Sequence, residues 1–346
     1  MAQTKVRVAL IGAGANTRLR HIPGFKAIKG VDIVGVANRT RESGKRITDE
    51  YGIPTVYDHW TEAVTDPDAN AVCIGTWPYM HRVMVEASLE HGKHVLTEAR
   101  MAMDALEARS MLDASRAHPD LVTHIVPAPL TLKVDRTIQR LIAEGYAGDL
   151  LSVDLISHLG GFVDRDGPMH WRYDRDFSGY NIMFMGIWYE TLMRWIGPAS
   201  SVTALTRVTV TSRKDAGGQR HVINIPDHVE VLAEMASGPV ARMRFSSVTG
   251  HPPADQVWLF GSEGTLHLDV PTMTLSGGQR KDKALSPISI PAKEQGEWRV
   301  EEEFVNAIRG TEKVHLTSFE DGVKYMEFTE AVTRSAQERR TISLPL

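Results

Sequence analysis

The stretch VRVALIGAGANT at residues 6–17 constrains the fold of this chain more than any other. Its aliphatic and β-branched run is typical of a buried strand, and Gly12-Ala13-Gly14 breaks the run before a segment that can begin a helix. A glycine pair there lets the chain turn tightly and lets backbone N–H groups approach a pyrophosphate at the positive end of the helix. Thr17 stands where the full G-x-G-x-x-G fingerprint has its third glycine, so an ordinary strand-to-helix turn is the competing interpretation.

Strands and helices alternate after this turn. Further apolar strands are predicted from Val31, at 71–75, in HVLTE and at 121–126, with helical segments between them. This alternation is typical of a doubly wound parallel sheet with helices on both faces. Residues 1–126 are therefore predicted to form one α/β domain.

The pattern changes after Pro127 and Pro129. The next segments predict a helix, a strand, a loop rich in charged and aromatic residues, and an apolar helix, at 134–144, 150–157, 160–179 and 182–196. Alternating strands then follow, with hairpins at Gly238-Pro239 and Glu263-Gly264. Residues 127–346 are predicted to form a second α/β domain with an open, mainly antiparallel sheet and a final amphipathic helix that can pack back on the first domain.

Composition narrows the class of protein. A net charge of −4 gives no electrostatic case for binding nucleic acid. No signal-like leader is recognised, and no apolar run is long enough to span a bilayer. Cys73 is the single cysteine, which excludes an internal disulfide framework, and its apolar setting in AVCIG favours a core residue over a nucleophile. We therefore expect a cytoplasmic protein that acts on a small molecule, without nucleic acid or membrane partners.

The end of the predicted second strand, Asn38-Arg39-Thr40, bears on the choice of dinucleotide. An acidic residue at this point binds the ribose 2′-hydroxyl of NAD, whereas an arginine accommodates the 2′-phosphate of NADP. Arg39 can pair with a phosphate and stack on adenine, and Thr40 and Arg41 back it. NADP is therefore favoured and NAD remains possible, with a solvated loop cation as the alternative role of Arg39.

Three stretches, GAGANTRLRHIPGF, GTWPYMHRVMVEASLEHGKHVLTEA and SFEDGVKYMEFTEAVTRSAQ, resemble the Gfo/Idh/MocA oxidoreductases, the glucose–fructose oxidoreductase and inositol dehydrogenase group. The resemblance covers most of the chain, and GKHVLTE is its most specific part. It implies a Rossmann domain followed by an open-sheet α/β domain, a nicotinamide cofactor, and hydride transfer on sugar or polyol-type substrates. It also implies a homo-oligomer, a dimer or tetramer assembled through the C-terminal sheet.

The resemblance also places the cofactor residues. The residues implied at the pyrophosphate are Gly12, Gly14, Ala15 and Asn16, and those beside the nicotinamide are Thr76, Trp77, Pro78 and His81. Glu98 is implied to reach the nicotinamide ribose. Asn38, Arg39 and Thr40, at the end of the second strand, are the other predicted cofactor residues. A helix-capping carboxylate is the alternative role of Glu98.

The family's catalytic groups are missing. The family reads E-K-P after its fourth strand, but this chain reads Glu98-Ala99-Arg100, and Ala99 cannot move a proton. Arg100 is a poor acid or base, although it can bind an anionic substrate.

The family's second signature, D-x-G-x-H-x-x-D on a helix, has lost its polar positions as well. Phe184, Trp188 and Thr191 take the places of the Asp, the His and the second Asp. Helical spacing sets them on one face with Asn181, which predicts a pocket wall that has become an aromatic platform.

Relocated acid and base groups are one explanation. The candidates are His158, His170, Tyr180 and Tyr189, because a histidine has a suitable pKa and a tyrosine can donate a proton beside a cation. Structural roles are open for both histidines, and a core position is open for Tyr189. No ligand spacing supports a metal site.

Three functions remain open at this point. The first is an NAD(P)-dependent oxidoreductase acting on a sugar, sugar-derived or cyclic hydroxy or keto substrate. The others are a lyase or hydrolase with transient redox chemistry and a non-catalytic nucleotide-binding regulator, and fold analogy alone cannot choose among them.

Overall fold

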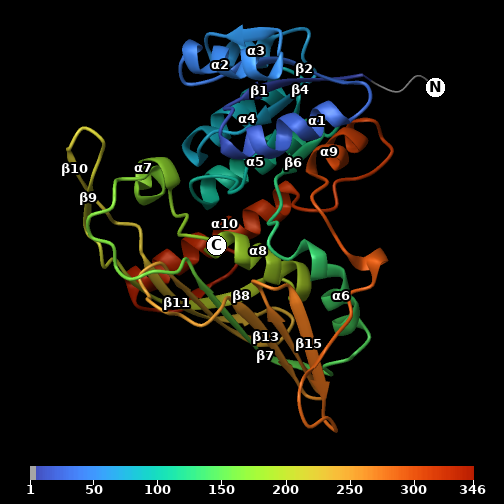
Figure 1. Ribbon diagram of the computed structural model, residues 1–346, viewed down its shortest axis with the longest axis vertical. Coiled ribbons are helices and arrows are strands. Elements are labelled where there is room, and N and C mark those ends of the chain that lie inside the picture. Colours follow the sequence, from blue (N-terminus) through green and yellow to red (C-terminus); the bar gives the residue numbers. More distant parts are fainter. Residues whose placement is uncertain (1–4) are drawn as a thin grey trace. The chain divides into compact units, whose positions relative to one another are not determined.

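The computed structural model describes residues 5–346, which form two compact units (Figure 1). Unit 1 consists of the described chain up to Pro127 together with Arg299–Val323, and unit 2 consists of Ala128–Trp298 and Lys324–Leu346. The chain therefore returns to unit 1 late in the sequence. The division at residue 126 made from the sequence does not include this return, because no local pattern marks it.

Unit 1 contains, within the described residues, a six-stranded parallel sheet in the order β3-β2-β1-β4-β5-β6. The strands are β1 (Val6–Ile11), β2 (Val31–Ala37), β3 (Thr55–Tyr57), β4 (Ala71–Ile74), β5 (His94–Thr97) and β6 (Thr123–Ile125). The helices are α1 (Ile22–Ala27), α2 (Arg41–Tyr51), α3 (Trp60–Thr65), α4 (His81–Glu90), α5 (Ala105–Ala117) and α9 (Val300–Ile308). The doubly wound parallel sheet is confirmed. Strand order reverses between β1 and β4, and this switch point is where such sheets bind ligands.

Unit 2 contains, among the residues described, a nine-stranded sheet in the order β16-β15-β14-β13-β7-β12-β11-β8-β17 and a separate β9–β10 hairpin. The strands are β7 (Leu150–His158), β8 (Ala199–Arg207), β9 (Ser212–Lys214), β10 (Arg220–Val222), β11 (His228–Met235), β12 (Val240–Ser246), β13 (Gln256–Gly261), β14 (Gly264–Asp269), β15 (Thr274–Gln279), β16 (Ser286–Pro287) and β17 (Ile342–Ser343). The helices are α6 (Leu132–Ala143), α7 (Arg175–Ser178), α8 (Met185–Ile196) and the part of α10 (Phe319–Glu338) that begins at Lys324. The sheet is mainly antiparallel, as expected, and β7 pairs with β12 in parallel.

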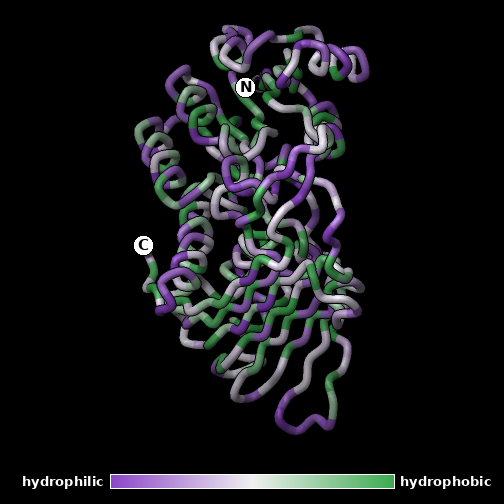
Figure 2. Tube along the Cα trace, turned by 90° about the vertical axis from the view of Figure 1, so that its left-hand side faces the viewer, coloured by the Kyte–Doolittle hydropathy of each residue, from purple (hydrophilic) through white to green (hydrophobic). Residues whose placement is uncertain are grey.

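The large sheet of unit 2 buries one face. Along β7, Val153 and Leu155 are buried whereas Asp154 between them faces outward, which is the period of a strand with one covered side. Figure 2 shows the same alternation of hydrophilic and hydrophobic residues along the strands. Helix α10 covers the buried face, where Ser335 Oγ accepts a hydrogen bond of 2.9 Å from Ala204 N of β8 (Figure 1).

Helix α8 begins later than the sequence indicates. The predicted helix starts at residue 182, but Met183 has a φ of +43° and Phe184 only flanks the first helical residue, Met185. A left-handed residue cannot continue an α-helix, so residues up to 184 form an irregular approach to α8.

Candidate dinucleotide site

Gly12 and Gly75 approach each other closely at the carboxyl ends of β1 and β4. Gly12 has a φ of +85°, and a Cβ built on it would lie 2.9 Å from Gly75 C and from Thr76 N. A Cβ on Gly75 would in turn overlap Gly12 O. The turn is closed by hydrogen bonds from Gly12 N to Ala37 O at 2.8 Å and from Gly75 N to Ile11 O at 2.7 Å. Two strand ends that come this close require glycine on both sides.

Thr17 replaces the third glycine without opening the turn. Its side chain is buried, and Oγ1 donates a 3.0 Å hydrogen bond to Gly12 O. It begins a single π-helical turn, Thr17–His21, a form that often marks functional sites. Gly14 and Ala15 remain exposed at the start of this helical segment, and a Cβ on Gly14 would have only an ordinary 3.7 Å contact.

The end of β2 is tied to the same turn. Asn38 Oδ1 accepts a 2.7 Å hydrogen bond from Ala13 N, and Thr40 Oγ1 caps α2 by accepting one of 3.2 Å from Ser43 N. Arg39 lies exposed between them and, within residues 5–346, makes no hydrogen bond or ion pair. Asn38 and Thr40 thus act on the backbone, while the Arg39 guanidinium remains available to a ligand.

His81 has a structural position after β4. It is fully buried, its Nε2 lies 3.1 Å from Thr76 O, and its Nδ1 lies 3.1 Å from both Arg100 O and Met101 O. Burial lowers the pKa of this imidazole against the opposing effect of the carbonyl groups. His81 therefore joins the loops that follow β4 and β5.

The other residues expected beside the nicotinamide lie in the loop that follows β4. Thr76 lies against Gly12, the half-buried Trp77 precedes a short 3₁₀ turn with its ring 6.5 Å from that of Tyr79, and Pro78 is buried. Arg100, predicted to be a substrate ligand, lies 6% exposed in the loop after β5.

Glu98 is held at the end of β5 by polar side chains. Its Oε1 lies 3.0 Å from His21 Nε2 and also accepts a hydrogen bond from Asn16 Nδ2. Burial would raise the pKa of Glu98, but the hydrogen bonds and charge of His21 outweigh it and keep the pKa below its usual range. Glu98 is an ionised carboxylate beside the glycine turn, and it caps no helix.

Glu301 is a site residue that the sequence did not reveal. It lies on α9, and its Oε1 is 2.5 Å from His21 Nδ1, which is buried between it and Glu98. Burial alone would lower the pKa of His21, but the two carboxylates raise it to about 9. Nothing in the local pattern around Glu301 or His21 could have paired them.

The catalytic candidates in unit 2 have different surroundings. His170 is exposed, and its Nδ1 accepts a 3.2 Å hydrogen bond from Arg172 N, which leaves Nε2 as the protonated nitrogen of the neutral ring. Burial and then the Arg172 charge lower the pKa of His170. The Arg175 guanidinium lies 5.0 Å from the ring centre of the half-buried Tyr180.

His158 and Tyr189 lie on different sides of the unit 2 sheet. His158 ends β7 in register with the outward residues, one position after the buried Ser157, and burial lowers its pKa. Tyr189 is 1% exposed on the helix-covered side, stacks on Phe328 at 3.7 Å, and accepts a 2.8 Å hydrogen bond from Ala199 N. Burial raises its pKa. These contacts favour the core position that the sequence left open for Tyr189 over a role in proton transfer.

The expected aromatic wall is only partly an exposed surface. Phe184 is 39% exposed, but Trp188, Thr191 and Asn181 are each at most 1% exposed. Asn181 and Phe184 precede α8, so the single helical face predicted for the four residues does not form. Thr191 Oγ1 accepts a hydrogen bond of 3.4 Å from Arg194.

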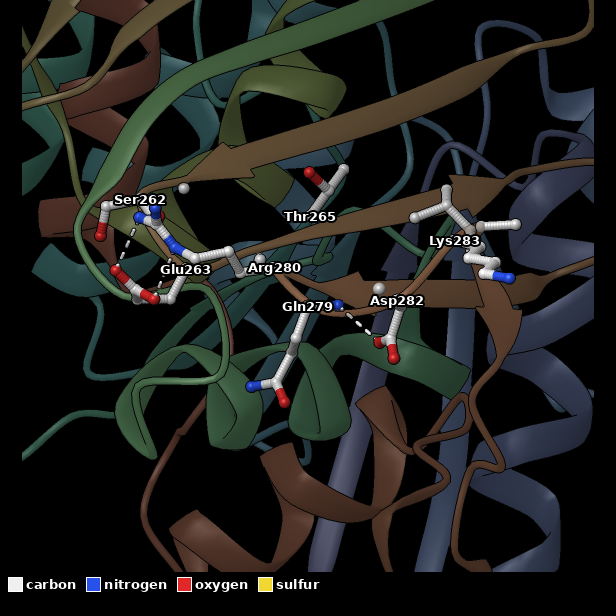
Figure 3. Close-up of a pocket in the computed structure, with 12 residues that line it drawn as sticks. Ser262, Glu263, Thr265, Gln279, Arg280, Asp282 and Lys283 are labelled. Atoms are coloured by element: carbon white, nitrogen blue, oxygen red, sulfur yellow. Dashed lines mark hydrogen bonds and ion pairs between the residues drawn. The ribbon is translucent and has the colours of Figure 1, made fainter.

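A pocket of about 460 Å³ opens elsewhere, between two hairpins of unit 2 (Figure 3). It contains none of the predicted site residues. Arg280 and Glu263, its most prominent charges, pair with each other at 3.0 Å. In the part of the chain that the structure describes, no group of three or more His, Cys, Asp or Glu side chains is placed to hold a metal ion. None of the helices described there is long and apolar enough to cross a membrane.

A parallel sheet with paired glycines at its switch point defines a dinucleotide-binding domain of the Rossmann class. Residues 6–125 match the oxidoreductase family with an NAD-binding Rossmann fold, and residues 136–267 match the GFO/IDH/MocA C-terminal domain. The chain belongs to the Gfo/Idh/MocA oxidoreductase family.

Similar proteins carry oxidoreductase names. The chain is 25% identical over 298 residues to trans-1,2-dihydrobenzene-1,2-diol dehydrogenase of Bos taurus, covering 84% of this chain and 81% of that one. It is 30% identical over 183 residues to 1,5-anhydro-D-fructose reductase of Ensifer adhaerens, covering 51% and 52%. The solved structure of a levoglucosan dehydrogenase in complex with NADH and L-sorbose has a TM-score of 0.86 at 20% identity, covers 99% of each chain, and is similar in fold.

Proposed function

We propose that this chain is an NAD(P)-dependent oxidoreductase that transfers hydride to or from a sugar, sugar-derived or cyclic hydroxy or keto substrate. The observation that carries the proposal is the ionised Glu98 beside the Gly12–Gly75 contact, an arrangement that suits the pyrophosphate and the nicotinamide-side ribose of a dinucleotide. The relatives named for a cyclic diol and for an anhydro sugar support the substrate class.

NADP is the favoured cofactor. The residues fit it because Gly12 and Gly14 leave room for a pyrophosphate, and because the exposed Arg39 makes no ion pair or hydrogen bond with the described residues. A guanidinium in that position binds a 2′-phosphate through charge-assisted hydrogen bonds. When bound, the nicotinamide supplies the hydride acceptor or donor, and the substrate hydroxyl proton is left for protein side chains.

His170 is the proposed acid and base, with Tyr180 as the second candidate. His170 is exposed, and its lowered pKa keeps the ring neutral at neutral pH, with the proton on Nε2. A neutral imidazole of this kind can exchange a proton with a substrate hydroxyl or carbonyl. The loss of the family lysine at Ala99 is what requires a relocated group.

A nicotinamide fluorescence titration with NADPH and NADH tests the proposal. We expect micromolar binding, tighter for NADPH, followed by turnover on one member of a panel of sugars, sugar acids and cyclic polyols. If neither cofactor binds below the millimolar range, the proposal fails. Binding without turnover would favour the nucleotide-binding regulator, and a net elimination or hydrolysis would favour transient redox chemistry.

We also propose a homo-oligomer in the cytoplasm. The outward face of the unit 2 sheet carries Trp258 stacked on Phe260 and His267, with ring centres 5.6 and 3.9 Å apart, and Leu205 and Leu232 are exposed on the same face. The ion pairs Arg242–Asp154 and Arg244–Glu230, on β7, β12 and β11, lie between the aromatic group and Leu205. A sheet face that combines aromatic, apolar and charged side chains in this way suits a second copy of the chain. Light scattering on the purified protein tests the assembly, and a monomer at micromolar concentration would contradict it.

A further inference from the structure

A chain of polar side chains runs through unit 1 from α9 to the glycine turn. Glu301 Oε1 lies 2.5 Å from His21 Nδ1, and His21 Nε2 lies 3.0 Å from Glu98 Oε1, the oxygen to which Asn16 also donates. His21 is fully buried and Glu301 is 3% exposed. Solvent therefore does little to screen these charges.

The geometry suits a doubly protonated His21. Each ring nitrogen faces a carboxyl oxygen, and an ionised carboxylate can only accept a hydrogen bond. A ring that donates from both nitrogens therefore satisfies both oxygens. The pKa of about 9 agrees with this, because the hydrogen bonds to Glu301 and Glu98 outweigh burial.

Buried titratable groups lie near this cluster, and burial lowers the pKa of His81, which interacts with Glu98. His124, on β6, has a pKa lowered to about 4, mainly by burial. Cys73, on β4, is fully buried, which raises the pKa of its thiol. Burial thus keeps these surrounding His and Cys side chains uncharged at neutral pH.

This arrangement leaves one oxygen of Glu98 for a ligand. Both hydrogen bonds of Glu98 fall on Oε1, and no described residue donates to Oε2. Gly24 of α1 leaves room for the Glu301 side chain in this position, since a Cβ there would lie 2.7 Å from the Glu301 carboxyl carbon. A larger residue at position 24 would therefore displace the Glu301 carboxyl group.

We propose that Glu301 and His21 are positioning residues that orient the Glu98 carboxylate toward the nicotinamide-side ribose. The return segment Arg299–Val323, which carries Glu301, thereby contributes to cofactor binding. This inference rests on the proposed function. Because the two residues act through Glu98, their removal is expected to change cofactor affinity and its pH dependence together.

The test compares dissociation constants for NADPH and NADH from about pH 6 to about pH 10 in four proteins. In the wild type, affinity holds to about pH 9 and falls as His21 loses its proton. Glu301→Gln keeps a hydrogen-bond partner for His21 but removes a negative charge, which lowers the pKa of His21. Cofactor affinity should therefore begin to fall roughly one pH unit or more below the wild-type value. His21→Gln weakens binding about tenfold and removes this fall. Glu302→Gln, on the exposed side of the same helix, follows the wild type.

NMR of the histidine ring nitrogens measures the protonation of His21 directly as the pH is changed. It needs no cofactor, so it also applies to a variant of reduced stability. We expect His21 to titrate near pH 9 in the wild type and lower in Glu301→Gln. A Glu301→Gln protein with the wild-type pH profile overturns the inference while leaving the proposed function intact. A wild type that binds neither cofactor at any pH overturns both.

Discussion

Glu301 Oε1 lies 2.5 Å from His21 Nδ1 although 280 positions separate the two residues in the chain. The folded-state pKa of His21, about 9, exceeds its ordinary value of 6.5, so protonation stabilises the folded state. That contribution is complete below about pH 6.5 and is lost as the pH rises through about 9. We expect the difference in thermal midpoint between wild type and His21→Gln to narrow across this window in scanning calorimetry.

The exposed His91 provides the control, because among the described residues its Nδ1 has a hydrogen bond to the carbonyl of Ala87 in the preceding helix and to no carboxylate. His91→Gln should follow the wild type at every pH. A His21→Gln difference that stays constant from about pH 6 to about pH 10 would show that His21 does not change its charge on unfolding in this range.

The glycine turn predicts unequal effects of two similar substitutions. Gly12→Ala places a side chain at a φ of +85° and 2.9 Å from Gly75 C, so we expect a loss of about 1–3 kcal/mol in the free energy of unfolding. Gly14→Ala meets its nearest neighbour, Gly75 O, at 3.7 Å and should unfold like the wild type. Urea denaturation of both proteins measures this, and equal losses would contradict the assigned roles.

Arg39 is expected to distinguish the two dinucleotides. Since Arg39 is exposed and pairs with no described residue, Arg39→Ala should leave stability unchanged and weaken NADPH binding at least about tenfold, with little effect on NADH. Arg46→Ala, which removes an exposed cation of α2 that pairs with Glu42 at 3.5 Å, is the matched control. Equal losses for both cofactors would mean that Arg39 does not contact the 2′-phosphate.

His170 and Tyr189 should separate catalysis from packing. Tyr189→Phe leaves the buried Ala199 N–H without its acceptor, so we expect a cost of about 1–3 kcal/mol in stability and an unchanged pH profile of kcat. His170→Ala should keep the thermal midpoint and lower kcat about 100-fold or more. Full activity in His170→Ala would transfer the proposed role to Tyr180, which Tyr180→Phe then tests.

Sequence patterns predicted unit 1 well because each strand is short, apolar and followed by a helix. The main omission among the strands is β3, which is short and has only Tyr57 buried, so it lacks the apolar run that marks the other strands. In unit 2 the alternation along the strands predicted the open sheet, but the parallel pairing of β7 with β12 joins distant segments and leaves no local pattern. The positive φ of Met183 shortened α8, and methionine gives no signal for such a conformation.

The residues of the candidate site also differ in how well the sequence predicts their positions. Gly12, Asn38, Arg39 and Glu98 follow strand ends, so their places could be predicted from the sequence. His21 was present in the quoted motif but had no predicted role, since its partner Glu301 comes from α9, which no pattern connected to unit 1.

The contact between Gly12 and Gly75 means that the fingerprint of this turn is shared by two segments. The G-x-G-x-x-G pattern covers only the segment that contains Gly12 and does not include Gly75. This chain does not match that pattern, because Thr17 stands at its last position. Because each glycine makes room for the other's backbone, enlarging both should cost less than the sum of the single changes, since the first already forces the loops apart. In homologous chains, small residues are therefore expected at positions 12 and 75 together.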